Sequence, residues 1–482
     1  MMMKNLIFAA ALISGAAMAA EPDLVLTGEL TYADYNHYRE VPFTVPAGVD
    51  RISVDFSQDG AAQRTTVDLG IADPQRVRGW SGGNKLHFTL AESDATPSYL
   101  PGAIEAGTWH LILGIPNIRQ GVTSHYRAEI RFGQQEEAPL KEGAGWYRGD
   151  LHMHTAHSDG FCLSQTGKKV NCPVFRTVEA AEAAGLDFIF VSDHNATSPY
   201  DDLRELQPFF DRILLLPARE MTTFHGHAGA LGVTDFIEFR IPDRLPDVTA
   251  MANQVHHFGG LLVLNHPNAP TGENCMGCGW DPATFDFTTA DGVEVVNGGG
   301  MRQAGDASLA LGFWRGLLDK GLHPTAVGGS DNHNADMPVD QSGSVGSPAT
   351  VVYAASLSER AILDGIKAGH VFVQVRGGDA SLKVELTAGS AMMGDHIPLA
   401  AGERKDVSLH VTGAEGGHVE ILSDGVAVPD EIARAPLSKD DRRSFTWRGD
   451  GKHHWLAVLI HDKDGKAVLL SNPLYAETPT KR

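Results

Sequence analysis

Hydrophobic and polar residues alternate along the first part of the chain, from residue 21 to residue 142. Segments 51–56 and 109–115 change between apolar and polar side chains with period two, and turns containing Gly and Pro separate such segments. This alternation predicts an antiparallel β-sandwich in which each sheet buries one face. Residues 134–139 are polar and turn-prone, which suits a linker after this domain.

The middle of the chain, residues 145–376, follows a different pattern, in which short apolar runs alternate with helical segments. The predicted strands are 188–191, 213–216, 261–264, 292–296 and 325–327, and the predicted helices are 177–184, 248–258, 307–320 and 358–368. Fully apolar strands separated by helices predict an α/β fold, with a parallel sheet or barrel covered on both faces. Strand-like alternation returns at 382–386, 407–411 and 454–460, so residues 379–482 are expected to form a second small β-domain.

The first twenty residues have the pattern of an export signal. Lys4 provides a positive start, residues 6–17 are apolar, and small residues at 17–19 suit a cleavage site. Ser14 and Gly15 interrupt the apolar run, whereas a membrane anchor needs about 18 apolar residues without a break. We therefore expect a signal peptide at 1–20 and a mature protein in the periplasm or outside the cell.

The charge balance narrows the range of partners. The chain has 39 Lys and Arg residues against 60 Asp and Glu residues, a formal net charge of −21. Nucleic acids and anionic membranes need a basic surface, so neither is an expected partner. A small anionic substrate remains compatible, because bound metal cations would reverse the sign of the charge locally.

The four cysteines have two interpretations. In an oxidising compartment an even number of Cys residues favours disulfides, here between neighbours in sequence, although the sequence leaves the pairing open. The alternative is a zinc site made of Cys162, Cys172, Cys275 and Cys278. A single CxxC with two distant Cys residues is a weak zinc pattern, so two local disulfides are preferred.

The central region places metal-competent side chains at the ends of its apolar strands. His152 and His154 are two residues apart, so in an extended segment both imidazoles point to one face and can reach one ion. The full set is His152, His154, Asp159, His194, Glu220, His227, His266, Asp331 and His333. Carboxyl ends of parallel strands converge on one edge or mouth, and so many polar groups there would be uncompensated without a metal. The sequence therefore predicts a metal centre.

The order of these motifs resembles that of a known superfamily. DLHMHT at 150–155, SDG at 158–160, VSDHN at 191–195, PARE at 217–220, NHP at 265–267 and GSDNH at 329–333 look like the successive motifs of PHP (polymerase and histidinol phosphatase) proteins. The spacing and the Gly226-His227 segment look most like the CehA/McbA-type metallohydrolase branch. The resemblance covers about residues 146–375 and does not include the two flanking β-domains.

The resemblance implies a distorted (β/α)7 barrel, flanked here by β-sandwich-like domains, with two or three divalent ions at the carboxyl ends of its strands. The first ion would be held by His152, His154, Glu220 and Asp331. Glu220 would bridge to a second ion on His227 and His266, and a third would lie on Asp159, His194 and His333. Zinc, manganese and iron all suit such a mixed set of nitrogen and oxygen ligands. Glu220, Asp331 and His266 are the expected catalytic residues.

Several assignments stay open at this stage. His225 competes with His227 as a ligand. His227 is preferred, because the corresponding ligand in the family that the sequence resembles follows a Gly and precedes an apolar strand. His157 and Asp193 are either partners that orient ligand imidazoles or ordinary loop residues. Arg219, Arg302 and Lys320 are either contacts for a phosphate or surface charges, and the second is preferred.

A metal centre of this kind predicts hydrolysis, because divalent ions lower the pKa of bound water and stabilise charge that develops on an ester. The first hypothesis is a phosphoesterase, the commonest activity in the resembling superfamily. The second is hydrolysis of a carboxylic or carbamic aryl ester, as the nearest branch suggests. A third is a secreted binding protein on a degenerate barrel. In each case the expected partner is a small molecule.

Overall fold

The structure is a computed structural model in which residues 21–135, 138–273, 275–280 and 285–478 are described. The predicted signal peptide at 1–20 lies outside the described residues, as does part of the predicted linker. The chain divides into two compact units: residues up to 91 together with 103–135, and residues 92–102 together with 136–482. None of the described helices is both long and apolar enough to span a membrane.

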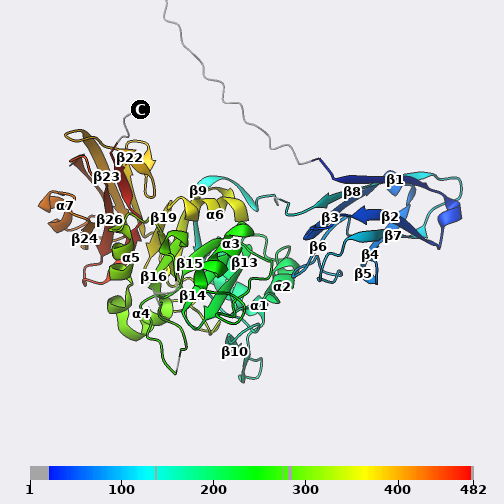
Figure 1. Ribbon diagram of the computed structural model, residues 1–482, viewed down its shortest axis with the longest axis horizontal. Helices are drawn as coiled ribbons and strands as arrows, with labels where there is room; N and C mark the ends of the chain where they lie inside the picture. Colours follow the sequence, from blue (N-terminus) through cyan, green and yellow to red (C-terminus); the bar gives the residue numbers. More distant parts are fainter. Residues whose placement is uncertain (1–20, 136–137, 274, 281–284, 479–482) are drawn as a thin grey trace, which may run out of the picture. The chain divides into compact units, whose positions relative to one another are not determined.

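The first unit consists of two antiparallel four-stranded sheets, drawn in blue to cyan in Figure 1. One sheet contains, in order, β1 (Leu24–Leu30), β8 (Ser124–Phe132), β3 (Arg51–Gln58) and β6 (His87–Ala91); the other contains β2 (Tyr38–Val45), β7 (Gly107–Asn117), β4 (Thr66–Ala72) and β5 (Val77–Ser81). Short 3-10 helices lie at Tyr32–Asp34 and Ala61–Gln63. Alternate residues of β8 are buried, which is the period-two pattern that the sequence predicts for a half-buried strand.

The second unit contains a large mixed sheet of fourteen strands. The part that carries the site consists of β9 (Lys141–Asp150), β12 (Phe188–Val191), β13 (Leu214–Thr223), β14 (Gly226–Leu231), β15 (Leu261–Leu264), β16 (Gly292–Asn297) and β17 (Thr325–Gly329). The remainder consists of β18 (Ala349–Leu357), β19 (Val371–Gln374), β22 (His396–Pro398), β24 (His418–Ser423), β26 (His454–His461), β27 (Ala467–Ser471) and β28 (Leu474–Glu477).

Strand direction explains why chemistry gathers at one edge of this sheet. The sheet order is β17-β16-β15-β14-β13-β12-β9-β18-β19-β27-β26-β28-β22, with β24 paired to β26. β9, β12 and β13 are parallel neighbours, as are β15, β16 and β17, while β14 is antiparallel to both of its neighbours. Six strands therefore run the same way, and their carboxyl ends meet at the edge where β14 begins.

Segments that follow β9 and β17 also bond to one another. The backbone N–H of His154 donates to the Asn332 carbonyl at 2.9 Å, and the N–H of Asp331 donates to the His152 carbonyl at 2.8 Å. These two bonds join the opposite ends of the β17-to-β9 arc at the level of the predicted ligands. A closed (β/α)7 barrel stays a prediction, whereas the mixed α/β sheet is observed.

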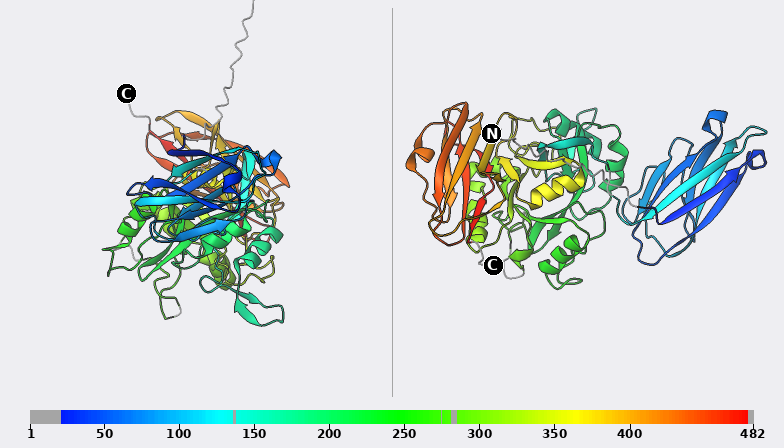
Figure 2. Two further views of the ribbon diagram at one scale, coloured as in Figure 1. Left: turned by 90° about the vertical axis from the view of Figure 1, so that its right-hand side faces the viewer. Right: turned by 90° about the horizontal axis from the view of Figure 1, so that it is seen from above.

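Helices cover this part of the sheet, as Figures 1 and 2 show in green and yellow. They are α1 (Val174–Ala183), α2 (Pro199–Leu206), α3 (Val248–His257), α4 (Gly298–Ala304), α5 (Leu311–Leu318) and α6 (Glu359–Lys367), with 3-10 turns at Phe287–Thr289 and Gly305–Ser308. In α1 the buried residues Val174, Val178 and Ala181 form one stripe that packs on the strands. β12 and β15 are buried along their whole length, since helices exclude water from their faces.

The strands after residue 379 do not stand apart from the central sheet. β19 pairs with β27 from Phe372–Ser471 to Gln374–Leu469, so the large sheet continues into them. A smaller sheet of β20 (Lys383–Ala388), β21 (Ala391–Met392), β23 (Arg404–Thr412) and β25 (Asp440–Arg448) packs on this extension and shares its core. Helix α7 (Asp430–Arg434) and the hairpin of β10 (Phe161–Leu163) and β11 (Lys169–Asn171) complete the unit. The chain thus clusters as two units, where the sequence analysis expects three folded parts.

Candidate metal centre

All nine predicted ligands belong to the second unit and lie at the shared edge of its parallel strands. His152 and His154 follow β9, His194 follows β12, and His266 follows β15. Asp331 and His333 follow β17, while Asp159 lies on the loop after the histidine pair. Glu220 lies inside β13, which extends beyond the predicted strand 213–216, and His227 is the second residue of β14, a strand that was not predicted.

Glu220 is the centre of the arrangement, with a side chain that is 1% exposed. Its Oε1 lies 2.9 Å from His266 Nε2, 3.3 Å from His152 Nε2 and 3.3 Å from His227 Nδ1. Its Oε2 lies 3.0 Å from His194 Nδ1 and 3.5 Å from His154 Nε2. Each carboxylate oxygen thus faces its own set of imidazoles, which is the arrangement that a carboxylate bridging two ions requires.

Asp331 approaches the same imidazoles from the other side. Its Oδ1 lies 3.3 Å from His154 Nε2, 3.5 Å from His152 Nε2 and 3.6 Å from His333 Nδ1. His152, His154 and Asp331 offer ligand atoms that all lie within 4.8 Å of one another, and so do His152, Glu220 and His266. His152 therefore belongs to both groups, whereas the resemblance assigns it to the first ion only.

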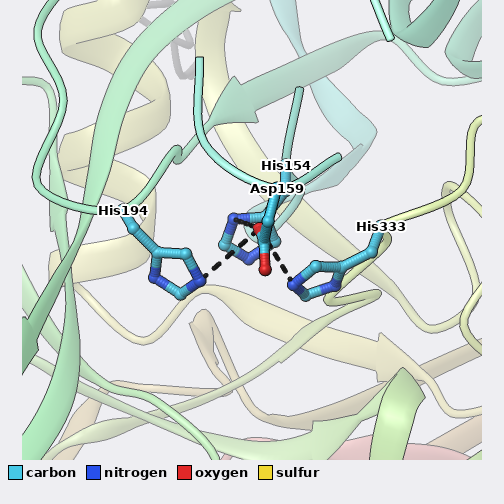
Figure 3. A group of neighbouring side chains, drawn as sticks. All are labelled: His154, Asp159, His194 and His333. Atoms are coloured by element: carbon cyan, nitrogen blue, oxygen red, sulfur yellow. Dashed lines mark ion pairs between the residues drawn. The ribbon is translucent and has the colours of Figure 1, made fainter. Parts of the chain in front are cut away.

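A third group, drawn in Figure 3, surrounds Asp159. Asp159 Oδ1 lies 3.3 Å from His333 Nε2, 3.7 Å from His194 Nε2 and 3.8 Å from His154 Nδ1. These four residues also offer ligand atoms within 4.8 Å of one another. The resemblance implies Asp159, His194 and His333 here, and the structure adds His154, whose two ring nitrogens face different groups.

The electrostatics of the cluster suit divalent cations. Burial alone would raise the pKa of Glu220, but the charge of His152 and hydrogen bonds from neighbouring imidazoles hold that pKa well below its usual value. Asp331 behaves in the same way: burial opposes ionisation, but His152 and His154 keep its pKa well below its usual value. Glu220 is therefore charged and buried, and Asp331 is charged and 20% exposed; burying such charges costs several kcal/mol per ion unless a cation compensates them. The donor set of imidazole nitrogens and carboxylate oxygens fits zinc, manganese or iron.

The third group also pairs a negatively charged carboxylate with imidazoles. Burial works against charge on both residues, yet the hydrogen bond between Asp159 and His333, together with the neighbouring charges, outweighs it. These interactions lower the pKa of Asp159 to about 2 and raise the pKa of His333 to about 9. His266 has a pKa raised to about 9, because its hydrogen bond to Glu220 and the surrounding carboxylate charges together outweigh the effect of burial.

Glu294 is the site residue that the sequence analysis missed. It lies in the middle of β16, is 2% exposed, and its Oε1 lies 3.0 Å from His152 Nδ1. Its Oε2 accepts hydrogen bonds from the His266 backbone N–H at 2.8 Å and from the Asn297 side chain at 3.1 Å. The available signal was a single carboxylate in an otherwise apolar strand that was predicted to be buried. Such a partner fixes the tautomer of a ligand imidazole.

Two asparagines complete the polar surroundings of the carboxylates. Asn265 donates to Glu220 Oε1 at 3.1 Å, and its own Oδ1 accepts from the Gly229 backbone N–H at 3.0 Å. Asn297 donates to Asp331 Oδ2 at 3.3 Å as well as to Glu294. Both side chains are at most 9% exposed, so these hydrogen bonds are made out of contact with bulk water.

The structure distinguishes the residues that were left open. His227 points at Glu220, and the ion pairs of Glu220 among the described residues do not include His225. Asp193 accepts from Thr155 and from the Ser158 hydroxyl, which in turn contacts His154 Nδ1 at 3.3 Å, so it acts on a ligand through Ser158. His157 instead bonds to Ser198 and Asp202, away from the ligand imidazoles.

The basic residues offered as phosphate contacts do not gather at the cluster. Arg219 is fully buried, and its guanidinium donates to the backbone carbonyls of Val233 and Asp235. Arg219 and Glu220 are consecutive in β13, so their side chains point to opposite faces of the strand. Arg302 and Lys320 are exposed on α4 and after α5. Arg219 is therefore a buried structural residue, so both the preferred interpretation as a surface charge and the alternative as a phosphate contact are wrong.

The cysteines pair locally. Cys162 pairs with Cys172, with Cα atoms 4.9 Å apart, and Cys275 pairs with Cys278, with Cα atoms 5.6 Å apart. Both separations lie in the usual range for disulfides. The preceding residue Asn274 lies outside the described residues.

Backbone strain also marks this edge. His266 and Asp331 have positive φ angles of 27° and 51°, a region that non-glycine residues rarely adopt. Each such residue costs on the order of 1–3 kcal/mol and persists where the surroundings force it. Gly329 is required by space, because a Cβ there would collide with the Glu294 carboxylate and with His152.

No protein-family model and no curated protein sequence matches the chain. Among solved structures, one that resembles it is a two-domain protein from Bacteroides vulgatus ATCC 8482 that contains a predicted PHP-like metal-dependent phosphoesterase. The two share 18% sequence identity, the match covers 71% of this chain and 98% of the other, and the TM-score is 0.38. With a TM-score below 0.5, this likeness supports no conclusion about activity, so any functional conclusion depends on the side chains of this chain.

Proposed function

We propose that this protein is a metal-dependent hydrolase of ester bonds, with phosphate esters as its first candidate substrates. The observation that supports the proposal most is Glu220, a buried carboxylate whose two oxygens face separate sets of imidazoles. A purely structural carboxylate needs one or two partners, whereas this one is surrounded by five potential metal ligands. Two or three divalent ions would satisfy the whole cluster.

Ions bound there would supply a nucleophile at neutral pH, because a divalent cation lowers the pKa of coordinated water toward 7. The chain's own residues prepare this chemistry. Glu220 and Asp331 hold negative charge between the imidazoles, while Glu294 and the two asparagines fix the orientation of those ligands. His266 Nε2 lies 2.9 Å from Glu220 Oε1, where it would ligate an ion beside the bridging carboxylate. We propose Glu220, Asp331 and His266 as the residues that carry catalysis.

Phosphate esters suit the overall charge of such a centre. Asp159, Glu220, Glu294 and Asp331 provide four negative charges, which three divalent ions would exceed. The loaded site would then attract an anionic substrate although the chain as a whole is acidic. We propose a small-molecule ester as substrate and export from the cytoplasm as the route to it.

One observation favours a second candidate, a carboxylic or carbamic aryl ester. Among the described residues, the ion pairs of the cluster involve only histidines, and Arg219 is turned away from it. A phosphoesterase often adds an Arg or Lys to the metal ions, while a neutral ester needs none. The two activities therefore differ in their expected dependence on substrate charge.

The test compares three substrate classes before and after chelation. The probes are p-nitrophenyl phosphate, bis-p-nitrophenyl phosphate and 1-naphthyl acetate with its N-methylcarbamate analogue. We expect turnover of a phosphate ester that disappears with the metal and returns on adding zinc, manganese or iron. Turnover of only the naphthyl esters would select the second candidate. Metal binding without any turnover would favour a non-catalytic binding protein, and equal turnover after complete metal removal would contradict both hydrolases.

A further inference from the structure

The loop that contains Cys275 and Cys278 packs directly on the β13–β14 hairpin that carries Glu220 and His227. Gly277, at its tip, has a φ of +73°, and a Cβ there would collide with the Thr223 carbonyl. The disulfide closes the loop across three residues of sequence separation. Two residues after Cys278, the Trp280 ring lies against Gly226, and its Nε1–H donates to the Asn265 carbonyl at 3.3 Å.

Two main-chain carbonyls of this loop reach ligand imidazoles. The Met276 carbonyl lies 3.1 Å from His227 Nε2, and the Cys278 carbonyl lies 3.3 Å from His266 Nδ1. A carbonyl oxygen can only accept, so the ring nitrogen that faces it must carry the proton. The nitrogens left to ligate a metal ion are then His227 Nδ1 and His266 Nε2. These are the two atoms that face Glu220 Oε1, at 3.3 Å and 2.9 Å.

We propose that the disulfide-closed loop 275–278 is a positioning element for one metal ion, because it fixes the tautomer and the orientation of both His227 and His266. The inference rests on the proposed metal centre but concerns residues outside the ligand set. Hydrogen-bond partners of this kind change metal affinity by about 10–100-fold when they are removed. Here both partners are backbone carbonyls, of Met276 and Cys278. Orienting the imidazoles, which a side chain usually does, therefore depends on the covalent closure of the loop.

Among the described residues, the hydrogen bonds that the loop makes within itself lie at its base, and the disulfide is the covalent closure of its tip. The base is held by the paired backbone bonds between Gly272 and Cys275, each 3.1 Å, and by the Gly279 N–H to the Thr271 hydroxyl at 2.8 Å. Between these anchors, Met276 and Gly277 depend on the closed ring to keep their distance from the hairpin. Opening the ring adds conformational freedom to the segment that holds the Met276 carbonyl.

The other disulfide provides a matched control. The Cys162–Cys172 pair lies next to His333, where the Phe161 N–H donates to the His333 carbonyl at 2.8 Å and the Ala156 N–H donates to the Cys172 carbonyl at 2.7 Å. Removing it opens a disulfide of the same unit without touching the contacts to His227 and His266. General destabilisation from a lost disulfide should therefore occur in both double variants, and weakened binding at the His227–His266 position in only one.

The experiment measures zinc retained per chain during dialysis against a graded series of chelator concentrations. We compare the wild-type protein, Cys275→Ser/Cys278→Ser and Cys162→Ser/Cys172→Ser. We expect one zinc equivalent to be held about 10–100-fold more weakly in the first variant than in the control. Gly277→Ala, which displaces the loop with its disulfide intact, should weaken the same equivalent. In a His227→Ala/His266→Ala background, opening the loop should change zinc retention no further, because its two targets are gone.

Each contrary outcome has its own meaning. Equal retention in the two disulfide variants, with zinc bound by the wild-type protein, would overturn the positioning role and leave the hydrolase proposal intact. Absence of zinc, manganese and iron binding in the wild-type protein would overturn both. Tighter zinc retention after reduction with a dithiol would show that the freed thiols of Cys275 and Cys278 ligate together with His227, which also overturns positioning.

Discussion

At the scale of single residues, the proposed metal centre depends on Glu220. We expect Glu220→Gln to abolish hydrolysis and to weaken metal binding by more than about 100-fold, because a neutral amide cannot bridge two cations. The side chain keeps its size, so the fold should survive, as circular dichroism and thermal unfolding will show. Metal content and turnover are the measurements. Turnover near the wild-type rate in a folded variant would mean that Glu220 has been assigned wrongly.

Glu294 provides a subtler prediction. Its carboxylate contacts His152 Nδ1, so Glu294→Gln should lower metal affinity by about 10–100-fold without removing a direct ligand. Isothermal titration of the chelator-treated protein with zinc measures the change. Excess metal should restore most of the turnover, whereas it should not rescue Glu220→Gln. A variant that binds zinc as tightly as the wild-type protein would show that this carboxylate does not orient His152.

A residue pair in the first unit tests stability independently of the site. Burial alone would raise the pKa of Asp73, but hydrogen bonds from the Arg76 and Gln75 backbone and from Arg78 lower it below 3.8. A lowered pKa in the folded state contributes stability above the unfolded pKa, and that stability is lost as the pH falls through the folded value. The first unit should therefore lose stability below about pH 4.

Asp73→Ala should lower the free energy of unfolding at pH 7 by about 3–5 kcal/mol, because it removes the carboxylate partner of Arg78, which is 1% exposed. Asp73→Asn is the matched variant, since it keeps an acceptor for the two backbone N–H groups and removes only the charge. Its stability should depend less on pH between 4 and 2 than that of the wild-type protein. Denaturant unfolding of both proteins between pH 4 and pH 2 measures this difference in the free energy of unfolding.

At the scale of elements, the strand β17 has to lie close to the ligands. Gly329→Ala would push a methyl group against Glu294 and His152, and overpacking of this kind costs about 1–3 kcal/mol. We expect a lower unfolding temperature for the second unit together with weaker zinc binding. Gly312, which has open space at its Cβ on helix α5, is the control position, and Gly312→Ala should leave both properties unchanged or slightly improved. Unchanged zinc binding in Gly329→Ala would contradict the close approach.

The hydrophobic pattern predicted the elements that are buried on both sides most accurately. Strands 188–191 and 261–264 agree with β12 and β15 residue for residue, because a short apolar run ends where polar site residues begin. The pattern did not predict β14, since Gly226–Leu231 consists largely of small residues and carries little signal. Helix 307–320 is divided into a 3-10 turn at Gly305–Ser308 and α5, with Gly312 and Gly316 inside the predicted segment.

The site could be predicted as a set of residues more readily than as a geometry. Strand ends placed the nine predicted ligands at one edge, and the structure brings these side chains together there. The sharing of His152 and His154 between groups depends on ring orientation, which the sequence does not encode. Glu294 was missed because a lone charge inside a strand is visible in the sequence, while its partner 142 residues away is not.

At the scale of the whole molecule, the strands after residue 379 continue the central sheet, and the division into three domains stays a prediction. The extension of the large sheet through β19 and β27 joins residues about a hundred positions apart, and no local pattern announces such a pairing. The loop at 92–102 was also predicted to lie in the first domain. It belongs to the second unit, where the Ala95 N–H donates to Asp201 on α2 at 2.9 Å.

The division into units predicts a selective response to metal. All candidate ligands lie in the second unit, so zinc should raise the unfolding temperature of that unit, by an amount that grows with the free zinc concentration. Chelator should reverse the shift. The transition of the first unit, identified through its response to Asp73→Ala, should not move. Scanning calorimetry with and without zinc measures both, and a shift of the first transition alone would place the metal elsewhere.

The number of metal ions bound per chain is the decisive measurement for the proposed metal centre around Glu220. Elemental analysis of the purified wild-type protein, after dialysis that removes loosely held ions, gives this number in one measurement. We predict two or three zinc, manganese or iron ions per chain in the wild-type protein and fewer in Glu220→Gln. A wild-type protein that takes up none of these metals, even when they are supplied after chelation, would contradict the account.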